Sequence, residues 1–318
     1  MMDDTRTAGD NDNHDSHQYF HFLGGIYEPS AIQQLSDGRF LVVEDEKKHP
    51  FSLVTINPDG SVSTTPLSPG LLEAGDDFWK LDDLEGLALD RSGYIYALTS
   101  HSRDGDGDEK KSRNKLVRFR LEGDRVVSPI VVKGLKHALV AAHPVLAQAA
   151  EIHDVKNGGG LNIEALEISP DQQRLLIGFR SPLLDSRAII ASVENPSAIF
   201  ETGEPPRIAA KLETLDLGGN GIRAMSYIPL LGGYLIISGP VARAQSHFQL
   251  WFWNGQSGTP ARHVTAPEVQ GFEHAEGVSP AIIDGQQRII IVSDDGSREG
   301  GRFARYLLLN PAQLKIAP

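Results

Sequence analysis

The sequence predicts an all-β protein built as a β-propeller. A unit of two short strands joined by a polar turn recurs along the chain, with copies anchored at positions 30, 85, 164, 223 and 276. Strand-based repeats spaced by roughly 50 to 80 residues are typical of propellers, in which four-stranded blades surround a central channel. Five copies indicate five blades. A sixth blade, hidden in the long interval between positions 85 and 164, is the alternative.

The third copy shows the unit most clearly. Residues 162–168 alternate apolar and polar side chains, residues 170–173 have turn chemistry, and residues 175–179 are apolar without a helical period. The unit begins near Glu164 and ends at Arg180. Because the two strands of a hairpin are antiparallel, both side chains should lie at the same end of the blade.

The outer strands of the blades follow each copy. We expect them at residues 51–56 in blade one, 115–121 and 125–133 in blade two, 188–193 and 207–215 in blade three, and 248–253 and 261–265 in blade four. Residues 136–152 are rich in Ala, Leu and Val and are interrupted by Pro144. They predict one short helical insertion, which explains the longest interval.

The two ends of the chain have different predicted roles. Residues 1–17 are polar and acidic and predict a disordered tail, so that a single propeller domain covers residues 18–318. The last blade has three strands of its own, at 275–279, 288–293 and 303–309. We expect the apolar run 18–23 to supply the fourth strand, which closes the ring and removes its free edges.

Composition excludes several classes of partner and location. The net charge of −12 argues against nucleic acid. No run of about 18 apolar residues is present, so no membrane span is expected. The N-terminus lacks the apolar segment of a signal peptide, which favours a cytoplasmic protein. We expect a monomer that binds an anionic small molecule.

One end of the channel is the predicted site. The starts of the inner strands and the ends of the second strands share this face, and they bring Glu44, Asp45, Glu85, His101, Arg103, Asn162, Glu164, Arg180, Arg223, Glu276, Asp294 and Asp295. In the functional interpretation these side chains form a polar pocket. In the structural alternative they pair with one another and plug the channel.

The predicted pocket residues fall into three groups according to what their side chains can do. As catalytic acids or bases we expect His101, Glu164 and Glu85. Anion recognition suits Arg103, Arg180, Arg223 and Asn162. Calcium or magnesium, which prefer oxygen ligands, would be held by Glu85, Glu164, Glu276 and Asp294.

Other motifs are weak or missing. The acidic stretch 104–109 is similar to the start of a calcium-binding loop, but it lacks the later glycine and terminal glutamate of an EF-hand. Neither a G-x-S-x-G elbow nor an H-E-x-x-H zinc motif occurs.

Several blocks of the sequence, taken together and in order, resemble a bacterial family known as domain of unknown function 3616. The blocks are residues 100–103, 162–166, 178–182, 221–223, 237–240 and 294–296, and the resemblance covers about residues 20–312. Ala165 stands where related motifs have glycine. The family is similar to calcium-dependent phytase-like and esterase-like propellers. The resemblance implies the propeller fold and brings no established activity.

Two classes of function remain for the pocket, and one for the outer surface. The first is a metal-assisted hydrolase of an anionic ester or phosphoester. The second is a module that binds or senses a small molecule or protein without catalysis. The third is an interaction scaffold that uses the outside of the ring. Whether the protein is an enzyme stays open at this point.

Overall fold

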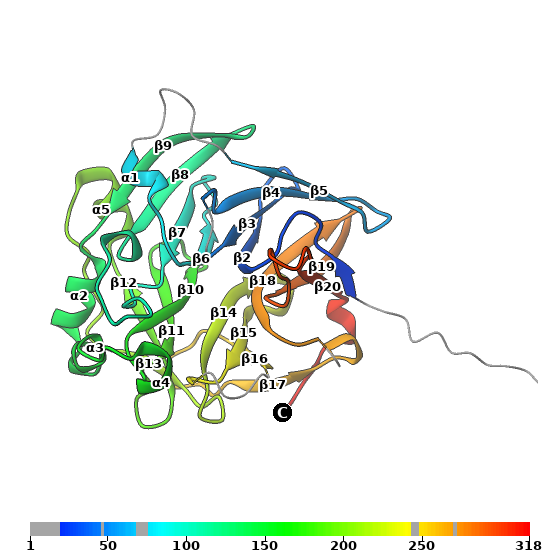
Figure 1. The fold of residues 1–318 in the computed structure, drawn as a ribbon. Coiled ribbons are helices and arrows are strands. Elements are labelled where there is room, and N and C mark those ends of the chain that lie inside the picture. The colour runs from blue at the N-terminus through cyan, green and yellow to red at the C-terminus, as the bar shows by residue number, and fades with distance from the viewer. Residues whose placement is uncertain (1–19, 46–47, 68–75, 243–247, 270–271) are drawn as a thin grey trace, which may run out of the picture.

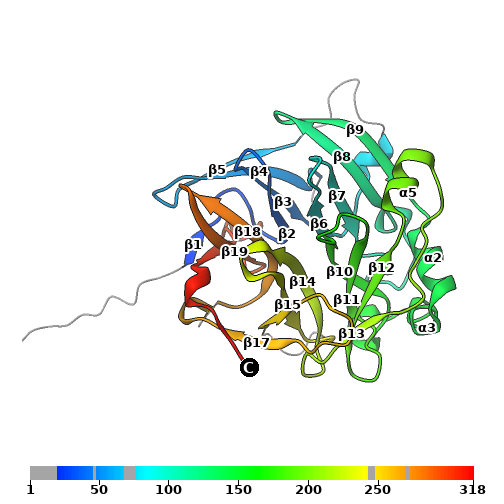
Figure 2. The same ribbon diagram turned by 180° about the vertical axis from the view of Figure 1, so that it is seen from behind.

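Five antiparallel sheets form a ring in the computed structural model, which describes residues 20–318 except 46–47, 68–75, 243–247 and 270–271. Figure 1 shows the inner strands β2, β6, β10, β14 and β18 around the centre, and Figure 2 shows the same arrangement from behind. The prediction of five blades is therefore confirmed. The predicted tail, residues 1–17, lies outside the described residues.

Blades one to three each contain four consecutive strands. Blade one consists of β2 (Pro29–Gln34), β3 (Phe40–Glu44), β4 (Phe51–Ile56) and β5 (Val62–Pro66). Blade two consists of β6 (Leu84–Leu89), β7 (Ile95–Thr99), β8 (Leu116–Glu122) and β9 (Arg125–Val132). Blade three consists of β10 (Asn162–Ile168), β11 (Leu175–Ser181), β12 (Ala188–Val193) and β13 (Glu213–Leu215). The last strand is shorter than predicted, because residues 207–212 contribute only an isolated bridge between Val193 and Ile208.

Blades four and five both use a strand from a chain end. Blade four consists of β14 (Gly221–Ile228), β15 (Gly233–Gly239), β16 (Gln249–Trp253), β17 (Arg262–Thr265) and the C-terminal β21 (Lys315–Ile316). Blade five consists of β18 (Ala275–Ile283), β19 (Gln286–Ser293), β20 (Arg305–Leu309) and the N-terminal β1 (Phe20–Phe22). Ring closure by the N-terminal strand is thus confirmed. β21 was not predicted, because a strand of two residues is too short to show an alternating apolar and polar pattern.

The helical insertion follows blade two. It comprises α2 (Leu135–Ala142), α3 (Pro144–Ala150) and α4 (Val155–Gly158), and Pro144 occupies the first turn of α3, where its missing N–H is harmless. Three helices were not predicted: α4, which lies beyond the predicted range 136–152, α1 (Asp76–Trp79) and α5 (Pro196–Thr202). Single 3₁₀ turns are η1 (Lys111–Arg113), η2 (Pro229–Leu231), η3 (Pro267–Val269) and η4 (Pro311–Gln313). No described helix has the length and apolar character needed to cross a membrane.

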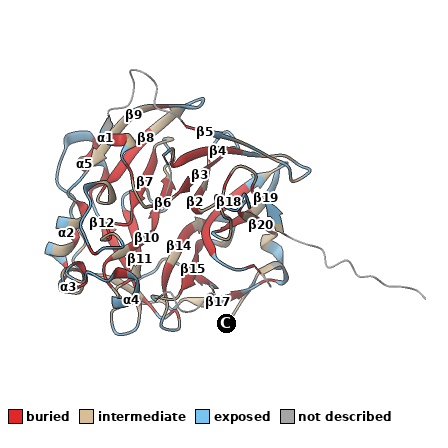
Figure 3. Ribbon diagram, in the orientation of Figure 1, coloured by how far each residue is buried: buried red, intermediate tan, exposed pale blue. Residues whose placement is uncertain are grey.

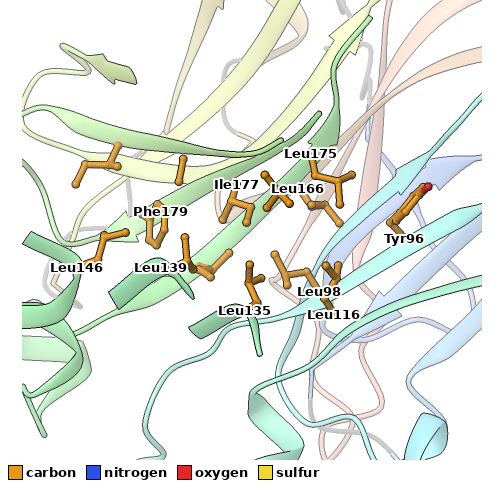
Figure 4. Close-up of a cluster of buried hydrophobic side chains, with 14 of the residues drawn as sticks. Tyr96, Leu98, Leu116, Leu135, Leu139, Leu146, Leu166, Leu175, Ile177 and Phe179 are labelled. Atoms are coloured by element: carbon orange, nitrogen blue, oxygen red, sulfur yellow. The ribbon is translucent and has the colours of Figure 1, made fainter. Parts of the chain in front are cut away.

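The apolar core lies between neighbouring blades. Figure 3 shows buried residues along the strands and exposed residues in the peripheral loops and helix faces. The insertion packs on blades two and three, where Leu135 and Leu139 of α2 meet Leu98, Ile177 and Phe179 in one buried cluster (Figure 4). These helices therefore cover the outside of two blades and bring residues 151–160 back to the ring.

The first prediction concerns closure of the ring. β1 pairs with β20 from Phe20, opposite Leu307, to Phe22, opposite Arg305. Deleting residues 1–16 should leave the free energy of unfolding nearly unchanged, whereas deleting residues 1–24 should lower it by several kcal/mol, because blade five loses a strand. Urea unfolding of both truncated proteins measures the difference, and equal stabilities would argue against closure by β1.

Candidate functional site

A β-bulge in every inner strand aims one side chain at the channel. The pairing between inner and second strand shifts register next to each repeat anchor, so that one residue stands outside the ladder. A bulge bends its strand and redirects the extra side chain. The bulged residues are Ser30, Glu85, Glu164, Arg223 and Glu276, and all five line one cavity.

This cavity has a volume of about 1080 Å³ and occupies one end of the channel. It brings together eight of the nine residues to which the sequence assigned a role, namely Glu85, Arg103, Asn162, Glu164, Arg180, Arg223, Glu276 and Asp294. Ten of its described lining residues are Asp or Glu and five are Lys or Arg. The excess of carboxylates favours a cationic ligand, or an anion accompanied by a cation.

Two ion pairs lie at the base of the cavity. Arg180 Nη1 donates to Glu164 Oε1 over 3.2 Å, and Arg180 Nε donates to the Pro240 carbonyl oxygen over 3.2 Å. Arg223 Nη1 donates to Glu276 Oε1 and joins blade four to blade five. Glu164 is only 4% exposed, and its Oε2 atom has no hydrogen-bond partner among the described residues. A buried carboxylate oxygen is costly unless it is paired, so Glu164 Oε2 is an acceptor that a ligand atom or a water molecule could satisfy.

The carboxylates raise one another's pKa values. Burial, reinforced by neighbouring carboxylates, raises the pKa of Glu85 well above its usual range. Burial also raises the pKa of Glu276 to about 8, although Arg223 opposes this shift. Desolvation, followed by repulsion from Glu28, raises the pKa of Asp294 to about 7, even though its side chain remains accessible within the cavity. A bound proton or cation would relieve this crowding.

The best oxygen cluster differs from the predicted metal site. Asp45, Asp83 and Glu85 each offer a carboxylate oxygen, and these three atoms lie within 4.8 Å of one another. Of the four predicted ligands only Glu85 belongs to this cluster. Glu164 and Glu276 accept hydrogen bonds from arginines instead, and Asp294 stands outside the cluster.

Arg113 was not predicted to belong to the site. It lies in the loop between β7 and β8, where the repeated pattern does not indicate which way a side chain points. Its guanidinium lines the cavity and holds the neighbours of the carboxylate cluster. Nη1 lies 3.3 Å from Asp83 Oδ2 and donates to Ser102 Oγ over 3.1 Å, while Nε donates to Asp82 Oδ2 over 3.0 Å. The guanidinium of Arg113 thus holds Asp83, one of the three carboxylates of the cluster, in place.

Arg103 lines the cavity but is engaged with the insertion. Its Nε donates to the Ala150 carbonyl oxygen over 3.1 Å, and its Nη1 donates to the Gly107 carbonyl oxygen over 3.2 Å. The acidic stretch 104–109 forms a turn around Asp104, whose Oδ1 accepts the N–H groups of Asp106 and Asp108. Both features shape the cavity wall.

The expectation that His101 faces the cavity does not hold. The ring is fully buried, Nδ1 lies 2.8 Å from the Thr99 carbonyl oxygen, and burial lowers its pKa to about 4. Its backbone is left-handed, with φ 54°, and this turn carries the side chain away from the extended path that the repeat suggested. Among the described residues, the imidazoles that do line the cavity are His153 and His274.

Two further residues of the predicted face also lie outside the cavity lining. Glu44 Oε2 accepts a hydrogen bond from Arg298 over 2.9 Å, and Asp295 Oδ2 accepts one from Arg305 Nε over 2.8 Å. Glu44 therefore ties blade one to the loop that follows β19 in blade five, whereas Asp295 holds that loop to β20 within blade five.

The second prediction concerns pH. The pKa of Glu276 is raised in the folded protein from 4.5 to about 8, so the folded state binds more protons than the unfolded state between these values. In chelator-treated protein this group's contribution to the free energy of unfolding is therefore present at pH 4.5 and is lost as the pH rises through 8. Glu276→Gln should show a shallower decline than wild type across this window. Glu122→Gln, on an exposed outer turn, is the control, and identical slopes for all three proteins would contradict the prediction.

One family model matches the chain over much of its length. The model of a family described as "Phytase-like: Esterase-like activity of phytase" matches residues 23–232. No curated protein matches the chain.

Several solved structures are also similar to the chain. The PQQ-bound aldose sugar dehydrogenase from Streptomyces coelicolor is 16% identical, with a TM-score of 0.44, over 91% of this chain and 98% of that one. A putative oxidoreductase (glucose dehydrogenase) from Thermus thermophilus is 16% identical, with a TM-score of 0.45, over 91% of this chain and 99% of that one. Because the family match extends over more than half of the 318 residues, the chain belongs to the phytase-like family.

Proposed function

We propose that the protein is a divalent-cation-dependent hydrolase of an anionic ester or phosphoester, acting in the axial cavity. One observation carries this proposal: the carboxylate cluster of Asp45, Asp83 and Glu85 shares a cavity with Arg180 and Arg223. Cation-binding oxygens beside arginines are what hydrolysis of an anionic ester requires. Membership of the phytase-like family supports the same class.

Calcium or magnesium fits the residues present. The cluster offers hard oxygen donors, and the unpartnered Glu164 Oε2 adds a buried acceptor in the same cavity. We assign the cation to Asp45, Asp83 and Glu85. The cation would supply Lewis-acid polarisation of a phosphoryl or acyl oxygen.

The chain's own residues bind the substrate and hold protons. Arg180 and Arg223 are placed to hold an anionic group, because guanidinium groups recognise phosphate and carboxylate with two parallel hydrogen bonds. Asn162 lies beside them, with Nδ2 3.5 Å from Glu164 Oε1, and can donate to the same group. Glu276, whose pKa is about 8, can retain a proton near neutral pH.

A narrower family assignment and the ligand follow from the same site. We assign the chain to the domain of unknown function 3616 branch, on the sequence blocks quoted above. The partner is an anionic small molecule, and its binding depends on the cation, because the carboxylates otherwise neutralise both arginines.

Binding without turnover is the second candidate. It is favoured by the ion pairs Arg180–Glu164 and Arg223–Glu276, which leave both arginines internally balanced. Turnover separates the two candidates: release of 4-nitrophenol from 4-nitrophenyl phosphate and 4-nitrophenyl acetate is measured with calcium, with magnesium and with chelator. Absence of metal-dependent turnover on both substrates would leave binding as the function.

The third prediction tests the cation site. Asp83→Asn removes a ligand charge but keeps the side-chain shape, so calcium affinity measured by calorimetry should fall at least tenfold, or about 1.4 kcal/mol. Asp284→Asn is the matched control, since Asp284 has a left-handed backbone like that of Asp83 but lies in the exposed β18–β19 turn, at the end of the hairpin away from the cavity. Equal losses in both variants would show that the effect is not specific to the cavity.

The fourth prediction tests anion recognition. Arg180→Ala should weaken calcium-dependent phosphate binding by about 1.5–3 kcal/mol, the scale of a hydrogen bond to a charged group. Arg207→Ala, at an exposed arginine paired with Glu194, is the control and should bind like wild type. Phosphate binding that depends neither on calcium nor on Arg180 would contradict the proposal and favour the internally paired plug.

A further inference from the structure

We propose that His274 is a proton-transfer residue of the axial cavity, a role that rests on the proposed hydrolase. The side chain lines the cavity and is exposed to it. It stands two residues before the bulged Glu276 at the entry to blade five. No described residue forms a hydrogen bond with its imidazole.

His274 occupies the same place in its blade as Asp83 does in blade two. Asp83 precedes the bulged Glu85 by two residues, and both Asp83 and His274 have a left-handed backbone, with φ of 61° and 55°. The Ser100 N–H donates to the Asp83 carbonyl oxygen over 2.9 Å, and the Asp294 N–H donates to the His274 carbonyl oxygen over 2.8 Å. In both blades the same left-handed backbone conformation therefore directs a side chain into the cavity.

This backbone conformation is costly for a residue with a Cβ atom. Glycine adopts left-handed φ values without strain, whereas other residues keep them mainly where the side chain has a use. The use of Asp83 is visible, because its carboxylate belongs to the oxygen cluster. Of the non-glycine residues with a left-handed backbone among the described residues, only Asp83 and His274 line the cavity, and this combination is what points to a use for the His274 imidazole.

The other histidines considered for this role are placed less well. His101 is fully buried and does not line the cavity. His153 belongs to the insertion and packs against the turn at Gly107, at the wall of the cavity. His274 is directly linked to the site, through its backbone bond to Asp294 and its position beside Glu276.

The proton balance of the step is simple. Neutral His274 accepts a proton from the attacking water while the new bond forms between the water oxygen and phosphorus or the acyl carbon. It then passes that proton to the departing alkoxide oxygen as the ester bond breaks. The products are the acid and the alcohol, and no oxidant or reductant is needed.

Chemical rescue tests this role on the full chain with calcium and 4-nitrophenyl phosphate. His274→Gly removes the imidazole and the backbone strain together, so kcat should fall about 10²–10⁴-fold while the melting temperature stays equal or rises. Added free imidazole should raise the kcat of His274→Gly at least tenfold, and this increase should saturate as the imidazole concentration rises. His274→Gln should be slow and should not respond to imidazole. Asp284→Gly, which relieves a left-handed residue in the β18–β19 turn away from the cavity, should keep wild-type kcat.

Each outcome decides a different point. Wild-type turnover combined with an unchanged kcat in His274→Gly overturns the role of His274 and leaves the hydrolase standing. A slow His274→Gly protein that imidazole does not rescue, or that has lost calcium affinity, also overturns proton transfer and indicates a structural or ligand role. A wild-type protein without turnover overturns the hydrolase and this inference together.

Discussion

Crowding at the axis is the constraint on which the rest of the structure depends. Five inner strands meet at the centre of the ring, and the residue after the bulge must be small. A Cβ atom on Gly86 would lie 2.7 Å from the Cβ atom of Leu166 in the neighbouring inner strand β10, and one on Gly277 would lie 2.8 Å from Val292 Cγ2 in its own blade and 3.2 Å from the Ile32 backbone nitrogen in the inner strand β2. Such contacts are too short for packed carbon atoms, so these positions exclude larger residues. Because a small residue follows each bulged residue, the inner strands can approach one another closely and the bulged side chains extend into the cavity.

The same crowding determines the electrostatics of the site. Glu85, Glu164 and Glu276 are brought together by backbone geometry and carry like charge, and only Glu164 and Glu276 have an arginine partner at the base of the cavity. Desolvation makes this arrangement unfavourable unless protons, cations or arginines compensate it. A site of this kind is sensitive to pH and to divalent ions at once, because both act on the same carboxylates.

The features of the site that could be predicted from the sequence are those that depend on the repeated hairpin. Glu85, Glu164, Arg223 and Glu276 recur at one phase of a hairpin, and hairpin geometry alone places them on one face. His101 was assigned wrongly because a single left-handed residue at a strand end reverses the direction of its side chain. Arg113 and His274 were missed because they lie in loops, where side-chain direction follows from long-range hydrogen bonds. Asp83 shows the same limit, since its contact with Arg113 joins segments that have no common period.

Closure of blade five by β1 has a consequence for biosynthesis. β1 precedes every other strand of the ring in the chain, whereas its partner β20 (Arg305–Leu309) is synthesised only after β2 to β19. Each of the first four blades can form its own hairpins as soon as it is made, because those contacts are local. The ring cannot close until β20 has been made, and the axial cavity, whose walls come from all five blades, is complete only then. A nascent chain that ends before β20 therefore lacks the complete cavity and carries the edges of an open ring.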